Sequence, residues 1–333
     1  MADRYISAHK TPNGPGDARP TAAQIIKDEA LDGGQLGGQT ALITGCSAGI
    51  GVDTAKALYA AGATLFLTAR DLAKARAALG DALVGDGERV HLLQLDLESF
   101  DNVRACAAEF LSKSATLNLL ICNAGVMTPP EGRTKDGFET QFGTNHLSHF
   151  LLFNLLQPAL LAGAATSNRA SRVIVLSSLA HRFGEVNFDN FNFDGNYDPW
   201  TAYAQSKTAN VWTANEIERR YGSQGVHAWS VHPGAVLTDL MRHMSDAEKT
   251  GFHEDPLLAK MFKNSEQGAA TSVWAATAAA LEGQGGKYLE DCRITGPWDP
   301  SVGEFGPGYA TYAYDVEKAT KLWNKSRELV GLQ

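Results

Sequence analysis

Strand-like and helix-like patterns of hydrophobic residues alternate along most of the chain. Short runs rich in β-branched and aromatic residues are separated by longer segments in which apolar residues recur at helical spacing. The runs are TALIT (40–44), TLFLT (64–68), VHLLQL (90–95), NLLIC (118–122), RVIVLS (172–177) and VHAWSV (226–231), with a weaker candidate at GKYLE (286–290). Such alternation is typical of a parallel sheet covered by helices on both faces. The pattern therefore predicts an α/β fold with a parallel sheet of about seven strands.

The segment between the first two runs supports this prediction. In GIGVDTAKALYAAG, Ile50, Ala57, Leu58 and Ala61 lie at the spacing of one helix face, and a glycine ends the segment. A strand, a helix and a second strand in this order form a βαβ unit.

The chain divides into three parts. We expect an N-terminal arm with one short helix (1–38), a single α/β domain (39–300) and a C-terminal tail with an amphipathic helix (301–333). Residues 1–20 carry proline, glycine and charge without an apolar period, so they are expected to be mobile. The stretch TAAQIIKDEAL that follows has Thr21 as a helix cap.

Two long segments interrupt the alternation within the main domain. They span residues 182–200, which are rich in Phe, Asn and Asp, and residues 239–265. Both would emerge near the carboxyl ends of strands, where open parallel sheets bind ligands. Long insertions at this edge are often lids or binding loops, and a surface decoration is the alternative.

Composition and charge narrow the classes of partner. The 333 residues are 44% hydrophobic, which is enough for a substantial core, and the formal net charge is -8. A negative chain is repelled by nucleic acid and by anionic membranes, which favours a small-molecule partner. The N-terminus lacks the apolar region of a signal peptide, and no apolar run approaches the roughly 18 residues of a membrane span. We therefore expect a soluble, cytoplasmic protein.

The cysteines give no indication of a metal or disulfide framework. They are widely scattered without a CxxC pair, so reduced and mostly buried thiols are expected. The four are Cys46, Cys106, Cys122 and Cys292.

A glycine cluster follows the first strand-like run. TGCSAGIG contains Gly45, Gly49 and Gly51, which would let backbone N–H groups approach a phosphate at the start of the next helix. The spacing is GxxxGxG, which differs from the common GxGxxG fingerprint, and a plain structural turn is the alternative.

With this turn in place, the chain resembles the short-chain dehydrogenase/reductase family, whose classical members carry TGxxxGxG here. Further family motifs follow in order: Asp96 after LLQL, CNAG at 122–125 and HPGAVLT at 232–238. The resemblance covers roughly residues 38–300 and implies a single Rossmann-type, doubly wound sheet that binds a nicotinamide dinucleotide. The cofactor-binding residues that it implies are Gly45, Ser47, Gly49, Ile50, Gly51, Arg70, Asp96, Leu97, Asn123, Ala124, Gly125, Tyr203, Lys207, Pro233, Gly234, Val236 and Thr238.

The end of the second strand indicates which nicotinamide cofactor is used. Ala69 stands where the NAD-specific carboxylate of the family would fall, and Arg70 follows it. A cation here suits the extra phosphate of NADP(H). Two observations weaken the inference: Ala48 stands where many NADP-dependent relatives have a second basic residue, and Arg70 could pair with Asp71 on the surface.

The candidate acid and base is a tyrosine four positions before a lysine. Tyr203 and Lys207 in TAYAQSK would share one face of a helix, and so would Tyr314 and Lys318 in YDVEK. An ammonium group favours the phenolate, and a tyrosine pKa near 7 would need about 4 kcal/mol from the lysine and an oxidised nicotinamide together. Spacing alone does not distinguish the two pairs.

The surroundings favour Tyr203. The fifth strand delivers Ser177 and Ser178 to the carboxyl edge of the sheet, and the family's substrate-orienting serine matches Ser178. The family's relay asparagine matches Asn145 in GTNHLSHFLL. The resemblance thus implies a catalytic set of Asn145, Ser178, Tyr203 and Lys207, whereas no comparable serine is paired with Tyr314, and Lys318 is expected on an exposed face.

The gap between Ser178 and Tyr203 is wider than is usual in the classical family and resembles the retinol dehydrogenase-like branch. NHLSHFLL, SSLAH, EQGAATSVWAAT and GKYLEDC resemble that branch as well. Aromatic and methionine side chains in the two long segments suggest an apolar, aromatic or extended ligand, or else only pack the segments down. They are Phe183, Phe188, Phe191, Phe193, Tyr197, Trp200, Met241, Met244, Phe252 and Met261.

Other candidate sites are weaker. His146 and His149 have a metal-like spacing but no completing ligand nearby, and His181 could line the substrate entrance or cover a loop. No GxSxG elbow supports a hydrolase. The sequence favours an NADP(H)-dependent reductase or alcohol dehydrogenase for a lipophilic or polycyclic substrate, with a homo-oligomer through two long helices implied by the family. A silent NADP(H)-binding scaffold and a dehydratase or epimerase are the alternatives.

Overall fold

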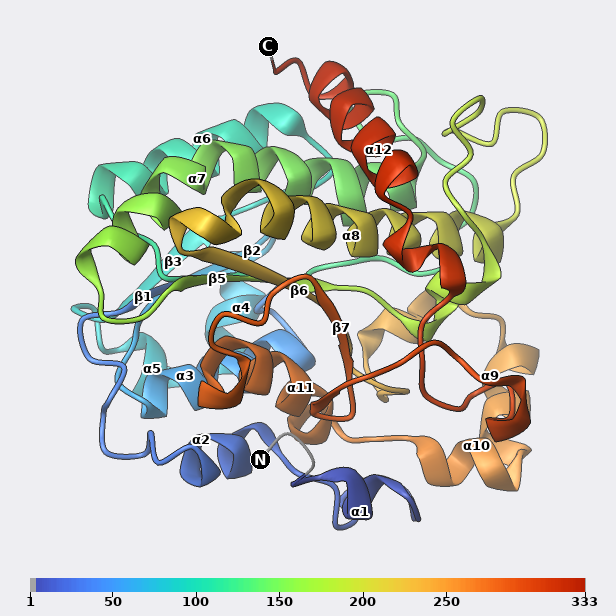
Figure 1. Ribbon diagram of the computed structural model, residues 1–333, viewed down its shortest axis with the longest axis horizontal. Coiled ribbons are helices and arrows are strands. Elements are labelled where there is room, and N and C mark those ends of the chain that lie inside the picture. The colour runs from blue at the N-terminus through green and yellow to red at the C-terminus, as the bar shows by residue number, and fades with distance from the viewer. Residues whose placement is uncertain (1–3, 333) are drawn as a thin grey trace.

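The computed structural model describes residues 4–332, without the side chains of Phe252 and His253. Its centre is a sheet whose strand order is β3-β2-β1-β4-β5-β6-β7-β8, parallel except for the short last strand (Figure 1). The strands are β1 (Thr40–Thr44), β2 (Thr64–Ala69), β3 (Val90–Gln94), β4 (Leu119–Cys122), β5 (Ser171–Leu176), β6 (Val226–His232), β7 (Lys287–Glu290) and β8 (Arg293–Ile294). The α/β class and the parallel sheet are therefore confirmed, with one more strand than the pattern suggested.

Helices cover both faces of the sheet. One face carries α6 (Phe100–Lys113), α7 (Ser148–Thr166), α8 (Pro199–Tyr221) and α12 (Val316–Leu329). The other carries α2 (Ala22–Asp28), α3 (Ile50–Ala60), α4 (Leu72–Leu79), α5 (Asp81–Val84) and α11 (Ser265–Thr277). The strand order reverses between β1 and β4, which is where open α/β sheets bind ligands beyond the carboxyl ends.

The helix α8 begins at a well-defined cap. Asp198 accepts a hydrogen bond from the N–H of Thr201, and Pro199 occupies the first helical position, where its missing N–H costs nothing. The helix then runs across the sheet, and nearly all of its residues from Ala202 to Ile217 are buried. This rigid burial fixes the Tyr203 and Lys207 side chains relative to the strand ends.

One helical stretch, Phe142–Thr166, is long and apolar enough to cross a membrane by length and composition, which the expectation from the sequence overlooked. Most of its most apolar window is buried inside the protein, against α6 and the sheet. Packing on the core thus accounts for its apolar sides.

The N-terminal arm is packed against the domain, contrary to the expected mobility. Residues 1–3 lie outside the described part, but α1 (Ile6–His9) and α2 lie against the domain below α11 (Figure 1). Arg19 is only 4% exposed. The expectation of mobility was wrong because it rested on the missing apolar pattern, whereas Arg19 and Gly14 form hydrogen bonds with backbone carbonyls of residues 260–262.

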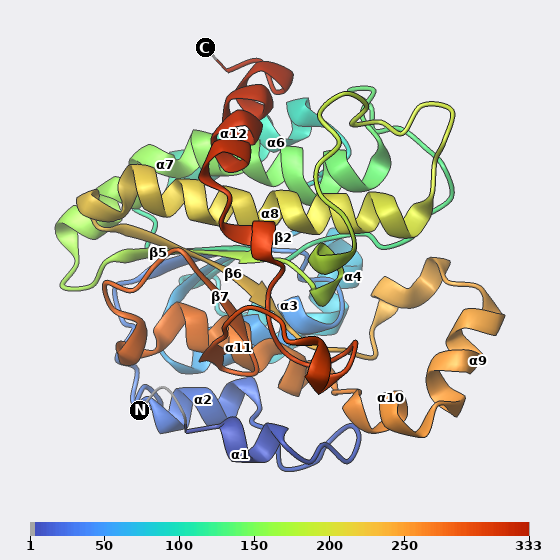
Figure 2. The ribbon, with the colours of Figure 1, turned by 45° about the vertical axis from the view of Figure 1, so that its right-hand side comes forward.

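Two segments lie beyond the carboxyl edge of the sheet. The aromatic loop (182–200) connects β5 to α8. The lid segment (239–262) follows β6 and contains a helical turn (Asp239–His243), α9 (Asp246–Glu254) and α10 (Pro256–Met261). Figure 2 shows α9 and α10 projecting to one side of the sheet, with the N-terminal segment beneath α10.

Candidate active site

The glycine turn after β1 leaves a cradle at the start of α3. Gly45 has a φ of +78°, and a Cβ on it would lie 2.9 Å from the Cα of Ala124, so only glycine fits without strain. A Cβ on Gly51 would collide with the carbonyl oxygen of Gly45. Gly49 provides no side-chain cap, so the positive end of α3 faces this turn, beside the half-buried Ser47. Such a cradle fits a pyrophosphate.

The turn after β4 is held against β1 by hydrogen bonds to Thr44. Thr44 Oγ1 accepts hydrogen bonds from the backbone N–H groups of Asn123 and Ala124, both at 2.9 Å, and Asn123 Nδ2 donates to the Thr44 carbonyl at 2.8 Å. A Cβ on the next residue, Gly125, would lie 3.7 Å from Lys207 Nζ. This turn therefore joins the glycine cradle to the lysine.

The loop after β6 closes the cradle from the other side. A Cβ on Gly49 would lie 3.0 Å from Thr238 Cγ2, so Thr238 stands next to the glycine turn. Lys263 Nζ donates to the carbonyl of Pro233 at 3.3 Å and to Asp291 at 2.9 Å, and its stem packs on Gly234. Lys263 thus holds the Pro233–Gly234 part of this loop in place.

Two other cofactor candidates pack on one residue of α11. Ile50 and Val236 both approach Gly268, so the start of α3 and the loop after β6 share one support. Leu97, by contrast, is buried in the core with its carbonyl bonded to Ser148.

The ends of β2 and β3 carry two ion pairs. Arg70, whose side chain is 71% exposed, lies 3.4 Å from Glu98, while Asp71 caps α4 instead of pairing with Arg70. Asp96 pairs with Lys135 at 2.8 Å, and its pKa is lowered by that hydrogen bond against the opposing effect of burial. The surface ion pair that was the alternative for Arg70 is thus present, with Glu98 in place of Asp71.

The tyrosine and lysine of α8 meet the serine of β5. Tyr203 and Lys207 are 4% and 5% exposed, and Lys207 Nζ lies 5.4 Å from the centre of the Tyr203 ring. The ammonium donates to the Leu176 carbonyl at 3.2 Å. Ser178, which caps the turn Leu179–Phe183, hydrogen-bonds the Tyr203 hydroxyl. Ser177 instead bonds the Lys207 carbonyl and joins strand to helix.

Burial governs the protonation of this pair. Burial raises the pKa of Tyr203 to about 12, although the hydrogen bond to Ser178 opposes the shift. Burial lowers the pKa of Lys207 to about 8. The protein's own groups therefore keep Tyr203 a neutral phenol, because desolvation outweighs the hydrogen bond to Ser178. A neutral phenol is the form that donates a proton.

Asn145 lies in a π-helical turn, Phe142–Leu147, rather than in a regular α-helix. Its side chain accepts from the N–H of Val126 at 2.8 Å and donates to the Val126 carbonyl at 2.9 Å and to Ser206 at 3.0 Å. It thus ties the turn after β4 to α8. π-turns are rare and often occur at functional sites.

The second tyrosine–lysine pair is not built in the same way. Tyr314 lies in a 3₁₀ turn, whereas Lys318 belongs to α12, which begins after the cap residue Asp315. The Tyr314 hydroxyl accepts from the N–H of Tyr288 at 2.9 Å, and Lys318 pairs with Glu185. The two side chains therefore lie on different elements, and each bonds to another residue: Tyr314 to the backbone of Tyr288, and Lys318 to Glu185.

Apolar side chains surround the Tyr203 ring. Met127, Ala180 and Met244 form a buried cluster with it, and Leu240 and Met241 pack on that cluster. The lid segment therefore lies over the tyrosine. The Trp200 ring lies 6.4 Å from the Tyr203 ring. This apolar wall adjoins the hydroxyl that Ser178 bonds.

Most aromatic residues of the long loop pack it onto the domain. The Phe188 ring lies 6.3 Å from that of Trp212, the Phe191 ring lies 5.2 Å from that of Phe142, and Phe193 is buried. Of the others, Tyr197 bonds the Pro129 carbonyl, Phe183 is exposed, Met261 is half-buried, and the Phe252 side chain lies outside the described part. The packing interpretation thus holds for the buried members.

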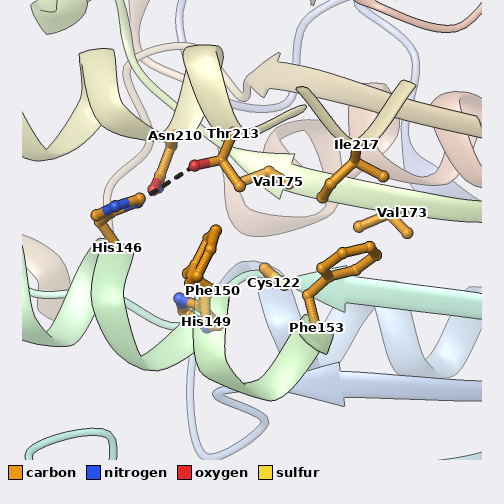
Figure 3. Close-up of a pocket in the computed structure, with 10 residues that line it drawn as sticks. All are labelled: Cys122, His146, His149, Phe150, Phe153, Val173, Val175, Asn210, Thr213 and Ile217. Carbon is orange, nitrogen blue, oxygen red and sulfur yellow. Dashed lines mark hydrogen bonds between the residues drawn. The ribbon is translucent and has the colours of Figure 1, made fainter. Parts of the chain in front are cut away.

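The two histidines near Asn145 are structural partners. His149 lies 2.9 Å from Thr44 Oγ1 and 3.0 Å from the Asn145 carbonyl, and His146 contacts Thr213 and Ser326. Both line an apolar void of about 10 Å³, with room for roughly one water, between α7, α8 and the sheet (Figure 3). Among the described residues, no cluster of His, Cys, Asp or Glu could hold a metal ion.

Sequence reasoning missed several supports of this site. Thr44 and Lys263 hold the two cofactor-side turns, and His181 joins the Ser178 carbonyl to the N–H of Ala310 in the tail. A polar residue at the end of a buried strand was the available signal for Thr44. The contacts of Lys263 with Pro233 and of His181 with Ala310 join segments far apart in the sequence, so no local pattern could reveal them.

Comparisons with known proteins agree with this geometry. A family model described as short chain dehydrogenase matches residues 39–249. The chain is 44% identical to short-chain dehydrogenase/reductase prx1 of Penicillium roqueforti over 99% of this chain and 95% of that protein. It is 37% identical to retinol dehydrogenase 12 of Homo sapiens over 90% and 88% of the two chains. A crystal structure of an uncharacterised Mycobacterium paratuberculosis protein, 31% identical, matches with a TM-score of 0.66 over 90% and 95%. The chain therefore belongs to the short-chain dehydrogenase/reductase family of oxidoreductases.

Proposed function

We propose that the protein is an NADP(H)-dependent reductase of a lipophilic ketone or aldehyde, which also oxidises the matching alcohol. The observation that carries the proposal is the buried Tyr203 hydroxyl, bonded to Ser178 and walled by apolar side chains. Members of this family use a nicotinamide cofactor, which supplies or accepts the hydride.

In the reduction direction, Tyr203 would donate its proton to the oxygen of the carbonyl substrate. Its raised pKa keeps the phenol protonated at neutral pH, and Ser178 would orient the same oxygen by a hydrogen bond. Lys207 carries a positive charge below a pKa of about 8 and would offset the negative charge left on the phenolate. Asn145 would hold the turn after β4 in register with α8.

The preference for NADP(H) rests on Ala69 and Arg70. Ala69 offers no carboxylate to a ribose hydroxyl, and the exposed Arg70 could turn toward a 2′-phosphate. Its contact with Glu98 is a surface ion pair, worth about 0–1 kcal/mol, and would be exchanged for the phosphate at little cost.

The preference for a lipophilic substrate rests on the cluster around Tyr203. A carbonyl compound that reaches this hydroxyl would lie against methionine and leucine side chains of the lid segment. Methionines adapt to irregular apolar shapes, so aromatic, extended and polycyclic carbonyls fit this wall better than short polar ones.

A panel of carbonyl compounds tests the function. Wild-type protein is expected to oxidise NADPH, followed by its absorbance, with aromatic or polycyclic carbonyls and less with short hydrophilic ones. Tyr203→Phe is expected to lower kcat by at least about 10²-fold, because it removes the proton donor. Tyr314→Phe, the control, is expected to keep kcat. Tight NADPH binding without turnover on any compound would favour the silent scaffold.

A further inference from the structure

The N-terminal segment, residues 14–19, binds the carboxyl end of the lid segment. Arg19 directs its guanidinium at the carboxyl end of α10, where Nη1 donates to the Met261 carbonyl at 2.7 Å and Nη2 to the Phe262 carbonyl at 2.6 Å. Nη2 also approaches the carbonyls of Lys260 at 3.3 Å and Gly14 at 3.1 Å. A buried cation at the end of a helix satisfies carbonyls that have no partner within the helix.

A carboxylate completes the surroundings of this arginine. Arg19 Nε donates to Asp17 Oδ1 at 2.8 Å, and the Arg19 side chain is 3% exposed. The Arg19 hydrogen bond is also a main reason for the lowered pKa of Asp17, against the opposing effect of burial. A guanidinium with a paired charge and several acceptors can be buried, whereas one without them could not.

The same loop is fastened to the next helix. Gln267, in the first turn of α11, donates from Nε2 to Asp17 and to the Arg19 carbonyl, and its Oε1 accepts from the N–H of Gly16. The N–H of Gly14 donates to the Lys260 carbonyl at 2.8 Å. Residues 14–19 therefore bind both α10 and α11, on either side of the connection that ends the lid segment.

The other end of the lid segment reaches the reaction site. Met244 is buried against Tyr203, and Glu248 of α9 accepts a hydrogen bond from the Trp200 indole at 3.0 Å. The Glu248 contact is exposed, and so is the pair between Lys74 and Asp239 near the start of the segment. Exposed contacts of this kind hold a segment weakly. The buried contacts of Arg19 are the strongest polar attachment in the segment's described part.

We propose that Arg19 is a positioning residue for the substrate, which fixes the carboxyl end of α10 so that Met244 and Met241 form the wall over Tyr203. This proposal rests on the proposed function for the place of the substrate. It assigns the N-terminal segment a role in substrate affinity, although its residues do not line the cofactor cradle.

Hydrogen–deuterium exchange and steady-state kinetics on the full chain test this proposal. In Arg19→Ala and Arg19→Lys, exchange of amides in residues 246–262 is expected to rise about tenfold or more, with β4 and β5 unchanged. Lysine cannot reproduce the fork of the guanidinium, so it should not restore the contacts. Arg4→Ala is the control, because Arg4 lies in the same arm and forms an exposed pair with Asp28.

The kinetic experiment uses NADPH and the carbonyl compound of the panel that is reduced fastest. The KM for the carbonyl is expected to rise about tenfold in both Arg19 variants, the equivalent of one lost charge-assisted interaction, with kcat and the KM for NADPH within about threefold. An unchanged carbonyl KM with a loosened lid segment overturns the positioning role. Unchanged exchange in residues 246–262, or an equal rise in β4 and β5, overturns the attachment itself. If wild-type protein reduces no carbonyl, the proposed function fails, while the exchange result still decides whether Arg19 holds the lid segment.

Discussion

Single side chains in this protein take their roles from burial more than from their immediate sequence. Tyr203 and Tyr314 both precede a lysine by four residues, yet one is bonded by a serine at a strand end and the other accepts a backbone N–H. Burial likewise lowers the pKa of Lys207, whereas at Lys318 the hydrogen bond to Glu185 outweighs desolvation and raises the pKa.

Arg70 is predicted to select the cofactor. Arg70→Ala should raise the KM for NADPH at least about tenfold and leave the KM for NADH within about twofold, because only NADPH carries the phosphate that a cation would bind. Kinetics with both cofactors measure this difference. Arg76→Ala, an exposed arginine of α4, serves as the control. Equal effects on the two cofactors would remove the reason for preferring NADP(H).

Lys207 is predicted to destabilise the fold at neutral pH. Burial lowers its pKa from 10.5 to about 8, so the folded protein binds its proton less tightly than the unfolded chain does. The cost, up to about 3 kcal/mol, is complete below pH 8 and disappears as the pH rises toward 10.5. Lys207→Met should therefore raise the free energy of unfolding at pH 7 by about 1–3 kcal/mol, and by less at pH 9.5.

Urea denaturation at the two pH values measures this effect. The Leu176 carbonyl keeps a second donor, Asn210 Nδ2 at 2.9 Å, so the substitution leaves no orphaned acceptor there. Lys318→Met is the matched control, and its partly exposed ion pair should change stability by less than about 1 kcal/mol. A less stable Lys207→Met protein at pH 7 would show that the ammonium is well compensated.

At the scale of elements, the site depends on how closely the turns approach one another. The glycine turn, the turn after β4 and the loop after β6 all lie at the carboxyl edge of one sheet, and each contacts its neighbour through backbone atoms or short side chains. The sequence motifs predicted these turns because their glycines are local requirements. The π-helical turn at Asn145 was not predicted, since the surrounding apolar pattern is that of an ordinary helix.

Gly51 is predicted to be a contact point that tolerates no side chain. Gly51→Ala should lower the free energy of unfolding by about 1–3 kcal/mol and weaken NADPH binding, because the new Cβ meets the Gly45 backbone. Thermal unfolding and NADPH fluorescence titration measure the two effects. Gly251→Ala in α9 is the control: no atom lies within 4 Å of its Cβ, and alanine should favour that helix by about 0.5–1 kcal/mol. Similar results for both variants would contradict the close approach.

On the scale of the whole molecule, the N-terminal segment and the last helix both pack against the domain. The N-terminal segment binds α10 and α11, while α12 packs across α8 and contacts α7, the two long helices on that face (Figure 2). Part of the surface through which the family resemblance implies association is thus covered by this chain's own last helix. The Trp323 ring lies 4.8 Å from that of Phe150 and 6.1 Å from that of Phe153.

Trp323 is predicted to join the tail to the domain. Trp323→Ala should cost about 3–5 kcal/mol of unfolding free energy, because a large side chain that is 3% exposed leaves a cavity and the Arg220 guanidinium loses its ring contact. Denaturant unfolding measures this loss. Val316→Ala, at the exposed start of the same helix, should change stability by less than about 0.5 kcal/mol. A small effect at Trp323 would mean that α12 contributes little to the domain.

The sequence by itself determined the order and type of the main elements and the turns at the sheet edge. Strand runs and glycine positions are local requirements of backbone conformation and burial, so the first six strands begin and end within about one residue of their predicted bounds. The serine at the end of the fifth strand also favoured Tyr203 over Tyr314, whereas only the tertiary structure decided which carboxylate pairs with Arg70 and how Arg19 holds the lid segment. These contacts join residues far apart in the chain, and the buried contacts of Arg19 gain their strength from desolvation, which no local pattern encodes.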